Sequence, residues 1–561
     1  MKQYRCGPRG FVRTSLSIAV ALAVSAGTSA WAANDLDTPT AKAGFDTNAA
    51  AVHNTKWLGH NDLQGRVTYQ TTVHTYPNGR VIAFAGHFST NPPFPVNKLT
   101  GVAENNGTSL VDVTDPRNPV YLQHITAAGA RMNMICDGSV LPHGTAGHVY
   151  LLRENGAVSH EVWDVTDPVH STLVSTPVQH LNVTHRSWWD CRTGIAYIVG
   201  GATSASNPFK DGWNNKSSPN QHLKIVDLSD PASPIAIMDF GYPGQNPGST
   251  FLTPGTEVPV AGTRTASSNG LKTVPSGVHG PIVVSTFNGN AVAGGKAINR
   301  LYMPYGVGSD GIIAINDLTK VLPPPYGTGL YVNPFKPTDD ELLQSQIGVI
   351  FMPGVEGGHS SMPYYNIPLD QYANFTDNNV RDILAVSSEE TDNRCTGSPH
   401  LLYLLDITSK IGAGGHTSAE QHPWPISTIT VDDFSQRPNF CSRGTRFGVH
   451  SMDENFNSPF YGRLMVSAWF DAGLRVTDIR DPYHPVEVGY FIPPVNSNTQ
   501  PSSATIGGVV YTSKDVSCDN SYVDDDGLLY CGDRVGGGLD IVQLTGQAAQ
   551  IANIVGHPRN N

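Results

Sequence analysis

The sequence from Phe447 to Phe491 reads FGVHSMDENFNSPFYGRLMVSAWFDAGLRVTDIRDPYHPVEVGYF and decides the fold. It contains four short runs in which apolar residues alternate, separated by Gly, Pro, Asn and Asp. This pattern predicts a four-stranded antiparallel meander. Both faces of the meander carry apolar residues, so it requires a neighbouring sheet on each side.

The same unit recurs along the chain as an apolar strand that ends in Asp, often followed by Asp-Pro. The copies lie at 109–122, 160–168, 223–237, 312–318, 401–408, 474–482 and 538–544. Each follows a partner run, at Val81–Gly86, Val149–Arg153, Ile195–Gly200, Leu301–Tyr305, Ile383–Ser387, Leu464–Ala468 and Leu528–Gly532. Seven such units predict an all-β chain, folded as a seven-bladed β-propeller of four-stranded antiparallel blades. A closed ring of this kind leaves only short, protected sheet edges.

This repeat resembles that of the LVIVD-repeat proteins, with LKIVDLSDP at 223–231 as the clearest copy. That family consists of secreted or periplasmic β-propellers, so the resemblance implies the same fold and location. Two stretches are also similar to the selenium-binding protein/methanethiol oxidase family of metal-containing propellers. They are ILAVSSEE at 383–390 and LMVSAWFDAGLRVTDI at 464–479.

The N-terminal region predicts a secretory signal peptide over residues 1–32. Four basic residues precede an apolar run from Leu16 to Val24 and a small-residue cleavage site ending at Ala32. The run is too short to span a membrane, and we expect no membrane span elsewhere. We expect residues 33–63 to pack near the closure of the ring and residues 64–561 to form one propeller with long loops. The mature protein is therefore predicted to be periplasmic or secreted.

The charge of the mature chain limits the classes of partner. Removing residues 1–32 takes away four positive charges and no negative ones, so the net charge of −12 becomes −16. An acidic chain of this kind is not expected to bind nucleic acid or an anionic membrane surface. We expect a small-molecule substrate, with a protein partner as the alternative.

Six of the seven cysteines lie beyond the predicted signal peptide. An even number of cysteines in an exported chain is typical of disulfides. Their sequence order predicts the pairs Cys136–Cys191, Cys395–Cys441 and Cys518–Cys531. Buried free thiols are the alternative.

A histidine opens the innermost strand of four consecutive units. The four are His185 in VTHRSWW, His279 in GVHGPIV, His359 in GGHSSMP and His450 in GVHSMDE. Because innermost strands line the channel of a propeller, residues at equal depth converge on its axis. Neutral imidazole suits Fe, Cu, Zn and Ni, so the pattern predicts a four-His metal site. The alternative is a polar position that bonds to the backbone at the channel mouth.

The ligand type narrows the choice of metal. An all-imidazole set brings no negative charge to a divalent ion, and catalytic zinc usually has three protein ligands. Redox iron or copper is therefore favoured, whereas a three-His set would readmit zinc or manganese. In plan, four histidines on a seven-bladed propeller are similar to the carotenoid-cleaving oxygenases, which hold ferrous iron in this way.

Other side chains are candidates for supporting roles. Glu389 and Glu390 follow a strand of the fifth unit and could orient the imidazoles, and Tyr365 could transfer a proton. Asp453, three residues after His450, is a candidate for the same orienting role, and Asp190 is a weaker one. Near the channel mouth, three arginines could hold an anionic group, namely Arg131, Arg186 and Arg446. A surface or disulfide-loop role is the alternative for each.

These observations predict an exported metal-dependent oxidoreductase that acts on a small apolar or aromatic molecule. A metal-dependent lyase or hydrolase at the same site is one alternative, and a non-catalytic interaction module is another. The sequence contains no G-x-S-x-G elbow, no phosphate-binding glycine loop and no H-E-x-x-H motif.

Overall fold

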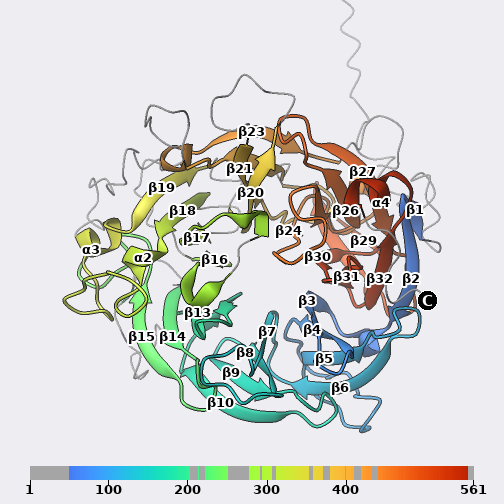
Figure 1. Cartoon of the computed structure of the whole chain (residues 1–561). Coiled ribbons are helices and arrows are strands. Elements are labelled where there is room, and N and C mark those ends of the chain that lie inside the picture. The colour runs from blue at the N-terminus through green and yellow to red at the C-terminus, as the bar shows by residue number, and fades with distance from the viewer. Residues whose placement is uncertain are drawn as a thin grey trace, which may run out of the picture.

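The computed structural model is a ring of seven antiparallel β-sheets around a central axis (Figure 1). The predicted all-β seven-bladed propeller is confirmed. The structure describes residues 50–201, 213, 221–249, 277–290, 293–305, 311–352, 358–369, 380–397, 400–409, 419–431 and 440–553. The predicted signal peptide lies outside the described residues and stays a prediction.

The first four blades follow one another along the chain, each running from an innermost strand to the rim. The first contains β3 (Thr68–Thr75), β4 (Val81–His87), β5 (Gly107–Asp112) and β6 (Val120–Thr126). The second contains β7 (Asn133–Asp137), β8 (Val149–Asn155), β9 (Ser159–Asp164) and β10 (Thr172–Gln179). The third contains β11 (Val183–Thr184), β12 (Trp188–Asp190), β13 (Ile195–Gly201), β14 (His222–Asp227) and β15 (Ile235–Phe240). The fourth contains β16 (Ile282–Val284), β17 (Arg300–Tyr305), β18 (Ile312–Asp317) and β19 (Gln346–Phe351).

The last three blades complete the ring with the help of the N-terminal segment. The fifth contains β20 (Ser360–Pro368), β21 (Val380–Ser387), β22 (Leu402–Asp406) and β23 (Trp424–Ile429). The sixth contains β24 (Ser451–Met452), β25 (Leu464–Ala468), β26 (Leu474–Asp478) and β27 (Val486–Ile492), extended by β1 (Ala51–His53). The seventh contains β30 (Cys518–Val523), β31 (Leu529–Asp533), β32 (Leu539–Leu544) and, at its rim, β2 (Thr55–Asn61). The N-terminal strand β2 pairs antiparallel with β32 near the C-terminus and thereby closes the ring.

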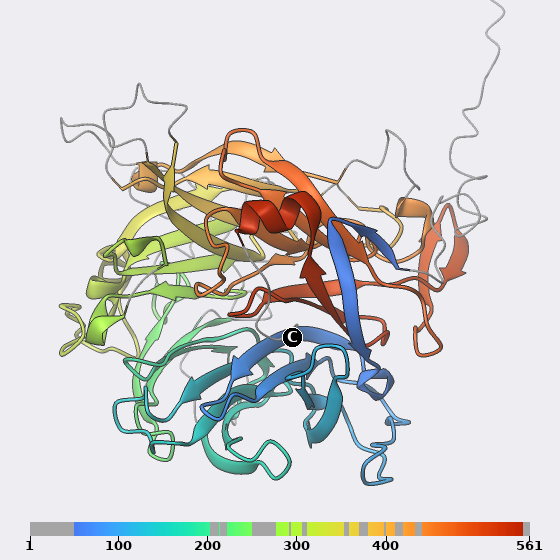
Figure 2. The ribbon, with the colours of Figure 1, turned by 45° about the vertical axis from the view of Figure 1, so that its right-hand side comes forward.

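The remaining described elements are short. A separate hairpin is formed by β28 (Ser502–Ile506) and β29 (Val509–Ser513), and the α-helices are α2 (Leu318–Val321), α3 (Asp339–Leu343) and α4 (Gly546–Ala552). The 3-10 helices are η1 (Leu63–Gly65), η2 (Phe287–Gly289), η3 (Ala293–Gly295), η5 (Ala419–Gln421) and η6 (Phe440–Ser442). Helix α4 lies beside the N-terminal strands (Figure 2), where the Thr545 backbone N–H donates to the Asn54 carbonyl.

The Asp that recurs at the end of the third strand has a local structural role. In the third strand of several blades the terminal Asp accepts a hydrogen bond from the backbone N–H two residues later, at 2.9 Å for Asp112, 2.8 Å for Asp227 and 2.9 Å for Asp406. The Asp of the following Asp-Pro does the same, at 3.0 Å for both Asp115 and Asp230. These side chains fix successive turns at the rim.

The core lies between neighbouring blades, and β13 shows why its sequence is apolar throughout. Every residue of this strand is buried. Ile195, Tyr197 and Val199 pack into a cluster shared with the fourth blade, whereas Ala196 and Ile198 pack into one shared with the second blade. Side chains alternate across a strand, so a blade between two others needs apolar residues on both faces.

The three predicted disulfides are present. Cys136–Cys191, Cys395–Cys441 and Cys518–Cys531 have Cα–Cα separations of 5.4, 5.3 and 5.6 Å. The first joins the second blade to the third, and the last joins β30 to β31 within the closing blade. The described helices lack the length and apolar character that a bilayer-spanning helix requires.

Candidate metal centre

The backbone sets the depth of the histidines in the channel. His279, His359 and His450 each stand at or just before the start of an innermost strand, and His185 lies between β11 and β12. The backbone N–H of three of them donates to a carbonyl near the end of the second strand, with distances of 2.8 Å for His279, 2.9 Å for His359 and 2.9 Å for His450. The repeated bond places these side chains at a similar level.

The four imidazoles form one row around the axis. The ring centroids of His185 and His279 lie 3.7 Å apart, those of His279 and His359 4.0 Å, and those of His359 and His450 4.3 Å. All four residues are buried. Segments that are far apart in the sequence therefore bring four histidine side chains together.

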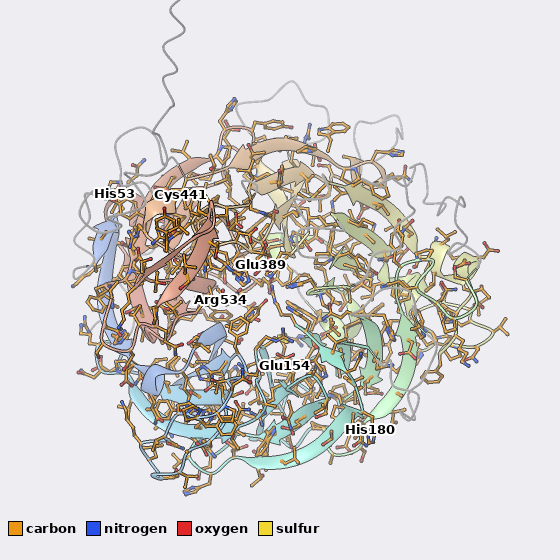
Figure 3. All side chains as sticks on the ribbon, turned by 180° about the vertical axis from the view of Figure 1, so that it is seen from behind. His53, Glu154, His180, Glu389, Cys441 and Arg534 are labelled. Carbon is orange, nitrogen blue, oxygen red and sulfur yellow. A yellow bond between two sulfur atoms is a disulfide. The ribbon has the colours of Figure 1, made fainter. Side chains whose placement is uncertain are left out.

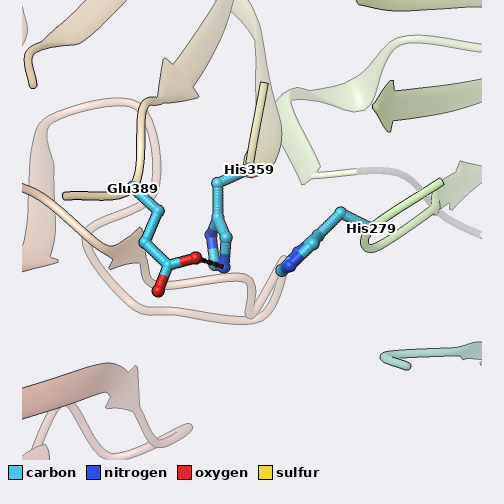
Figure 4. Close-up of side chains that lie close together, drawn as sticks. All are labelled: His279, His359 and Glu389. Atoms are coloured by element: carbon cyan, nitrogen blue, oxygen red, sulfur yellow. Dashed lines mark ion pairs between the residues drawn. The ribbon is translucent and has the colours of Figure 1, made fainter. Parts of the chain in front are cut away.

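Glu389 adds a carboxylate to this row. Its Oε2 lies 3.6 Å from His359 Nε2, and its Oε1 lies 3.7 Å from His450 Nε2. Ligand atoms of His279, His359 and Glu389 all lie within 4.8 Å of one another (Figure 4). Two imidazoles and one carboxylate form the facial triad that is typical of non-haem iron, and the same donor set also occurs in catalytic zinc sites.

His185 is arranged differently from the other three. Its Nδ1 accepts a hydrogen bond of 2.8 Å from the backbone N–H of Arg186. In the neutral ring the proton then lies on Nε2, so neither nitrogen has a free lone pair. His185 thus stands outside the three-residue group, and the carboxylate of Glu389 joins it instead.

The protonation state of the row suits metal binding. Burial lowers the pKa of all four imidazoles well below the ordinary value of 6.5, and neighbouring histidines and arginines lower it further. Three buried ring nitrogens have no hydrogen-bond partner among the described residues, namely Nδ1 of His279, Nδ1 of His359 and Nε2 of His450. Buried polar atoms are rarely left unpartnered. Neutral imidazole is the form that binds a cation, so the chemistry of these residues suits a metal ion. In His359 the nitrogen that faces Glu389 is Nε2, and the unpartnered nitrogen is Nδ1.

A layer of ion pairs surrounds the row. Arg446 Nη1 donates to Glu389 Oε1 at 2.8 Å, and Arg534 Nη1 donates to Asp519 Oδ1 at 2.9 Å. His450 Nδ1 donates a hydrogen bond of 2.6 Å to the Asp519 carbonyl oxygen, and Nε2 of the same ring faces Glu389. Figure 3 shows Glu389 and Arg534 near the axis of the ring.

Aromatic side chains lie beside the same residues. The Tyr69 hydroxyl is 3.4 Å from His359 Nε2, and the Phe470 ring centroid is 5.1 Å from that of His450. The rings of Phe88 and Tyr69 pack edge-on with their centroids 4.9 Å apart. The Arg534 guanidinium lies over the Phe88 ring, 4.3 Å from its centroid. The surroundings of the row are thus partly aromatic and partly cationic.

The other arginines named from the sequence also lie near the row. Arg131 pairs with the buried Glu154 at 2.8 Å, and Arg186 pairs with Glu454. Both guanidinium groups depress the pKa of His279. Nε and Nη1 of Arg186 are buried without a hydrogen-bond partner among the described residues.

The structure does not bring Glu390 or Tyr365 to the row. The Glu390 carboxylate turns towards His400, whose Nε2 is 3.9 Å away. Burial raises the pKa of Glu390 to about 7. Tyr365 stands six positions after His359 along β20, roughly 20 Å at the rise of a strand. Its hydroxyl bonds to the Tyr302 hydroxyl at 2.8 Å in the core between two blades.

The other two carboxylate candidates, Asp453 and Asp190, have structural partners. Asp453 accepts a 2.9 Å hydrogen bond from the Val523 backbone N–H. Asp190 accepts bonds from the Ser285 hydroxyl at 2.9 Å and from the Asn290 amide at 2.8 Å. Both therefore join neighbouring blades and do not contact the imidazoles in these bonds.

Tyr69 and Asp519 are site residues that the sequence reasoning missed. They stand on β3 and β30, the innermost strands of the first and seventh blades. The signal that could have found them is register, because they lie near the strand start, as the histidines do in their own blades. Because neither residue is a histidine, the histidine pattern does not mark them.

Comparisons with known proteins give one repeat match and distant similarities to solved structures. The LVIVD repeat matches residues 217–240, a segment that includes β14 and β15. The crystal structure of Chaetomium thermophilum Raptor is similar at 10% identity and a TM-score of 0.44, over 88% of this chain and 30% of that chain. A structural genomics target from Lactobacillus plantarum is similar at 10% identity and a TM-score of 0.40, over 83% of this chain and 95% of that chain. None of the curated proteins searched matches.

Proposed function

We propose that this protein is an exported metal-dependent oxidoreductase whose metal is bound in the channel by His279, His359 and Glu389, with His450 beside them. The observation that carries the proposal is the approach of ligand atoms from these three buried residues to within 4.8 Å of one another. Export is supported by the three disulfides, which persist in oxidising compartments.

The carboxylate favours iron within this proposal. Sequence reasoning favoured iron or copper for four imidazoles, with zinc or manganese for three. Two imidazoles and a carboxylate with open positions are typical of non-haem ferrous oxygenases, so Glu389 shifts the balance from copper to iron. A bound iron ion would supply one-electron and dioxygen chemistry.

The protein's own residues would hold and orient the reactants. Arg446 fixes one oxygen of Glu389 through the 2.8 Å hydrogen bond. The carbonyl of Asp519 fixes the tautomer of His450. Phe88, Phe470 and the ring of Tyr69 offer apolar surface near the row, which suits a small apolar or aromatic substrate.

A second candidate is a zinc-dependent lyase or hydrolase at the same site. The observation in its favour is that two histidines and a glutamate also form a catalytic zinc set. Tyr365, the proton-transfer residue expected from the sequence, is too far from the row for this role. Tyr69 replaces it as the phenol nearest to the imidazoles.

Metal analysis of the purified protein tests the proposal. We expect one iron per chain, lost in the separate variants His279→Ala, His359→Ala and Glu389→Ala. His87→Ala is the matched control, because His87 is equally buried but bonds to Ser109 within the first blade. Full metal occupancy in all three variants would end the proposal and leave a non-catalytic interaction module. Turnover without dioxygen by a zinc-loaded protein would favour the second candidate.

A further inference from the structure

The Cys395–Cys441 disulfide joins two segments beside the proposed metal centre. One, the glutamate loop, comprises residues 388–397 after β21 and carries Glu389. The other, the arginine segment, comprises residues 440–446 and ends at Arg446. The bridge therefore links the proposed carboxylate ligand to the guanidinium that orients it.

The two segments also pair through their backbones. The Arg394 backbone N–H donates to the Thr445 carbonyl at 2.9 Å. Asn393 and Arg446 form an antiparallel bridge, and Nη1 of Arg446 donates to the Glu390 carbonyl at 3.1 Å. The disulfide thus closes a short paired unit that includes the side-chain contacts of Arg446.

The arginine segment is anchored independently of the disulfide. Arg443 and Asp515 form a buried ion pair, with Nη2 of the arginine 2.6 Å from Oδ1 of the aspartate. The Thr445 hydroxyl donates to the Val516 carbonyl at 2.8 Å. Both contacts tie the segment to the chain just before β30, so the disulfide attaches the glutamate loop to a fixed partner.

The glutamate loop needs this attachment because its turn is unfavourable. Arg394 and Cys395 have φ angles of 57° and 53°, in the left-handed region that residues with a side chain rarely adopt. Such a backbone persists only where the surrounding structure holds it. The disulfide supplies a covalent part of that support, and its loss would let the turn relax.

This bridge is also open to a soluble reductant. Cys395 and Cys441 are both partly exposed. Each of the other two bridges contains at least one buried cysteine, namely Cys136 in one and both Cys518 and Cys531 in the other. Because thiol–disulfide exchange requires access to a sulfur, we expect the Cys395–Cys441 bridge to react first.

We propose that the Cys395–Cys441 disulfide is a positioning element of the metal centre, so that its reduction weakens metal binding. This inference rests on the proposed function. In the reduction a dithiol passes two electrons and two protons to the bridge, which becomes two cysteine thiols, while the dithiol becomes a disulfide. The glutamate loop then relaxes, and Glu389 loses its alignment with Arg446. The metal centre is therefore complete only in an oxidising compartment.

Paired serine variants test the inference. Cys395→Ser/Cys441→Ser opens this bridge, and Cys136→Ser/Cys191→Ser is the matched control. The two bridges span similar lengths, 46 and 55 residues, so their loss should destabilise the fold by similar amounts. The measurement is anaerobic titration of ferrous ion against a chelator. We expect affinity to fall about tenfold or more in the first variant and to stay at the wild-type value in the control.

The outcomes separate this inference from the proposed function. A wild-type protein that binds no ferrous ion would refute the proposed function. Wild-type affinity in folded Cys395→Ser/Cys441→Ser, or an equal loss of affinity in both variants, would overturn this inference and leave the proposed function standing.

Reduction of the native protein covers the case in which the double variant does not fold. The wild-type chain is treated with limited dithiothreitol, its new thiols are alkylated, the reagents are removed and ferrous ion is titrated. We expect mass spectrometry to find Cys395 and Cys441 alkylated first, and metal affinity to fall with the fraction modified. Earlier alkylation of another pair, or unchanged affinity after alkylation of this one, would overturn the inference.

Hydrogen exchange of the metal-free protein provides a readout that needs no metal. The Glu390 and Arg394 amides donate to carbonyls of residues 449 and 445. In Cys395→Ser/Cys441→Ser we expect these amides to exchange at least about tenfold faster than in the wild type, with no change in the buried strand β13. Wild-type exchange at both amides would refute the positioning role.

Discussion

Arg446 holds the carboxylate of Glu389 at the edge of the histidine row: Nη1 of the arginine lies 2.8 Å from Oε1 of the glutamate. The other oxygen of the same carboxylate, Oε2, faces His359 Nε2 at 3.6 Å. Partners of this kind orient ligands and tune metal affinity. One guanidinium thus links the outer layer of ion pairs to the proposed ligand set.

Arg446→Met is expected to weaken metal binding about 10- to 100-fold, because Glu389 loses the donor that orients it. The measurement is competitive titration of ferrous ion against a chelator of known affinity. Arg475→Met is the control, since Arg475 lies on β26 of the sixth blade and bonds to the Ala472 carbonyl and Glu487. Equal loss of affinity in both variants would point to general destabilisation.

Glu389→Gln and Glu390→Gln form a matched pair of neighbouring substitutions. We expect Glu389→Gln to abolish stoichiometric metal binding, because it removes the negative ligand from the set. We expect Glu390→Gln to retain the metal, since its carboxylate faces His400. Elemental analysis of both proteins after desalting checks this, and metal loss in Glu390→Gln alone would contradict the assignment.

Protonation of His359 is expected to contribute to acid sensitivity of the metal-free protein. Burial lowers the pKa of His359 well below its unfolded value of 6.5, so the unfolded chain binds its proton first. Its stabilising contribution is therefore complete above pH 6.5 and is lost as the pH falls below it, by about 1.4 kcal/mol per pH unit. Burial raises the pKa of Asp519 to about 7. The contribution of Asp519 to stability therefore increases as the pH falls, opposite to that of His359.

A difference measurement separates these contributions. Urea unfolding of the wild type and of His359→Leu between pH 7.5 and 5 should show a shallower decline in the variant, by about 1.4 kcal/mol per pH unit below the unfolded pKa. A chelator is present throughout, so that metal release does not contribute. Parallel curves would show that His359 is protonated equally in both states.

The disulfides are expected to stabilise the fold according to the loops they close. The Cys136–Cys191 bridge spans 55 residues and the Cys518–Cys531 bridge spans 13. Chain entropy predicts losses of about 4 and about 3 kcal/mol on replacing each pair by serine. Urea unfolding of the two double variants measures the difference. A larger loss for the shorter loop would show that another factor dominates.

The blades could be predicted from the sequence because strand alternation and turn-forming residues are local signals. Both the alternation of apolar residues in β13 and the turn-forming Asp227 at the end of β14 can be recognised in the sequence. The four histidines were also found from the sequence, since they open the same strand of successive units. Register in a repeat is thus sufficient to bring distant side chains together.

The directions of individual side chains could not be predicted in this way. Glu389 and Glu390 lie beyond the last residue of β21, where strand alternation no longer decides which one faces the axis. Tyr365 is on the correct strand but at its far end. Arg534 reaches the row from a turn after β31, and no repeat pattern marks that position.

The pairing of β2 with β32 has a consequence for biosynthesis. Thr55, opposite Leu544, leaves the ribosome or the export channel long before its partner strand. Until the last blade is synthesised, β2 has an open edge that can recruit another chain. The ring therefore closes only when β2, near the N-terminus, pairs with β32, near the C-terminus. A holding chaperone would be needed most before that pairing.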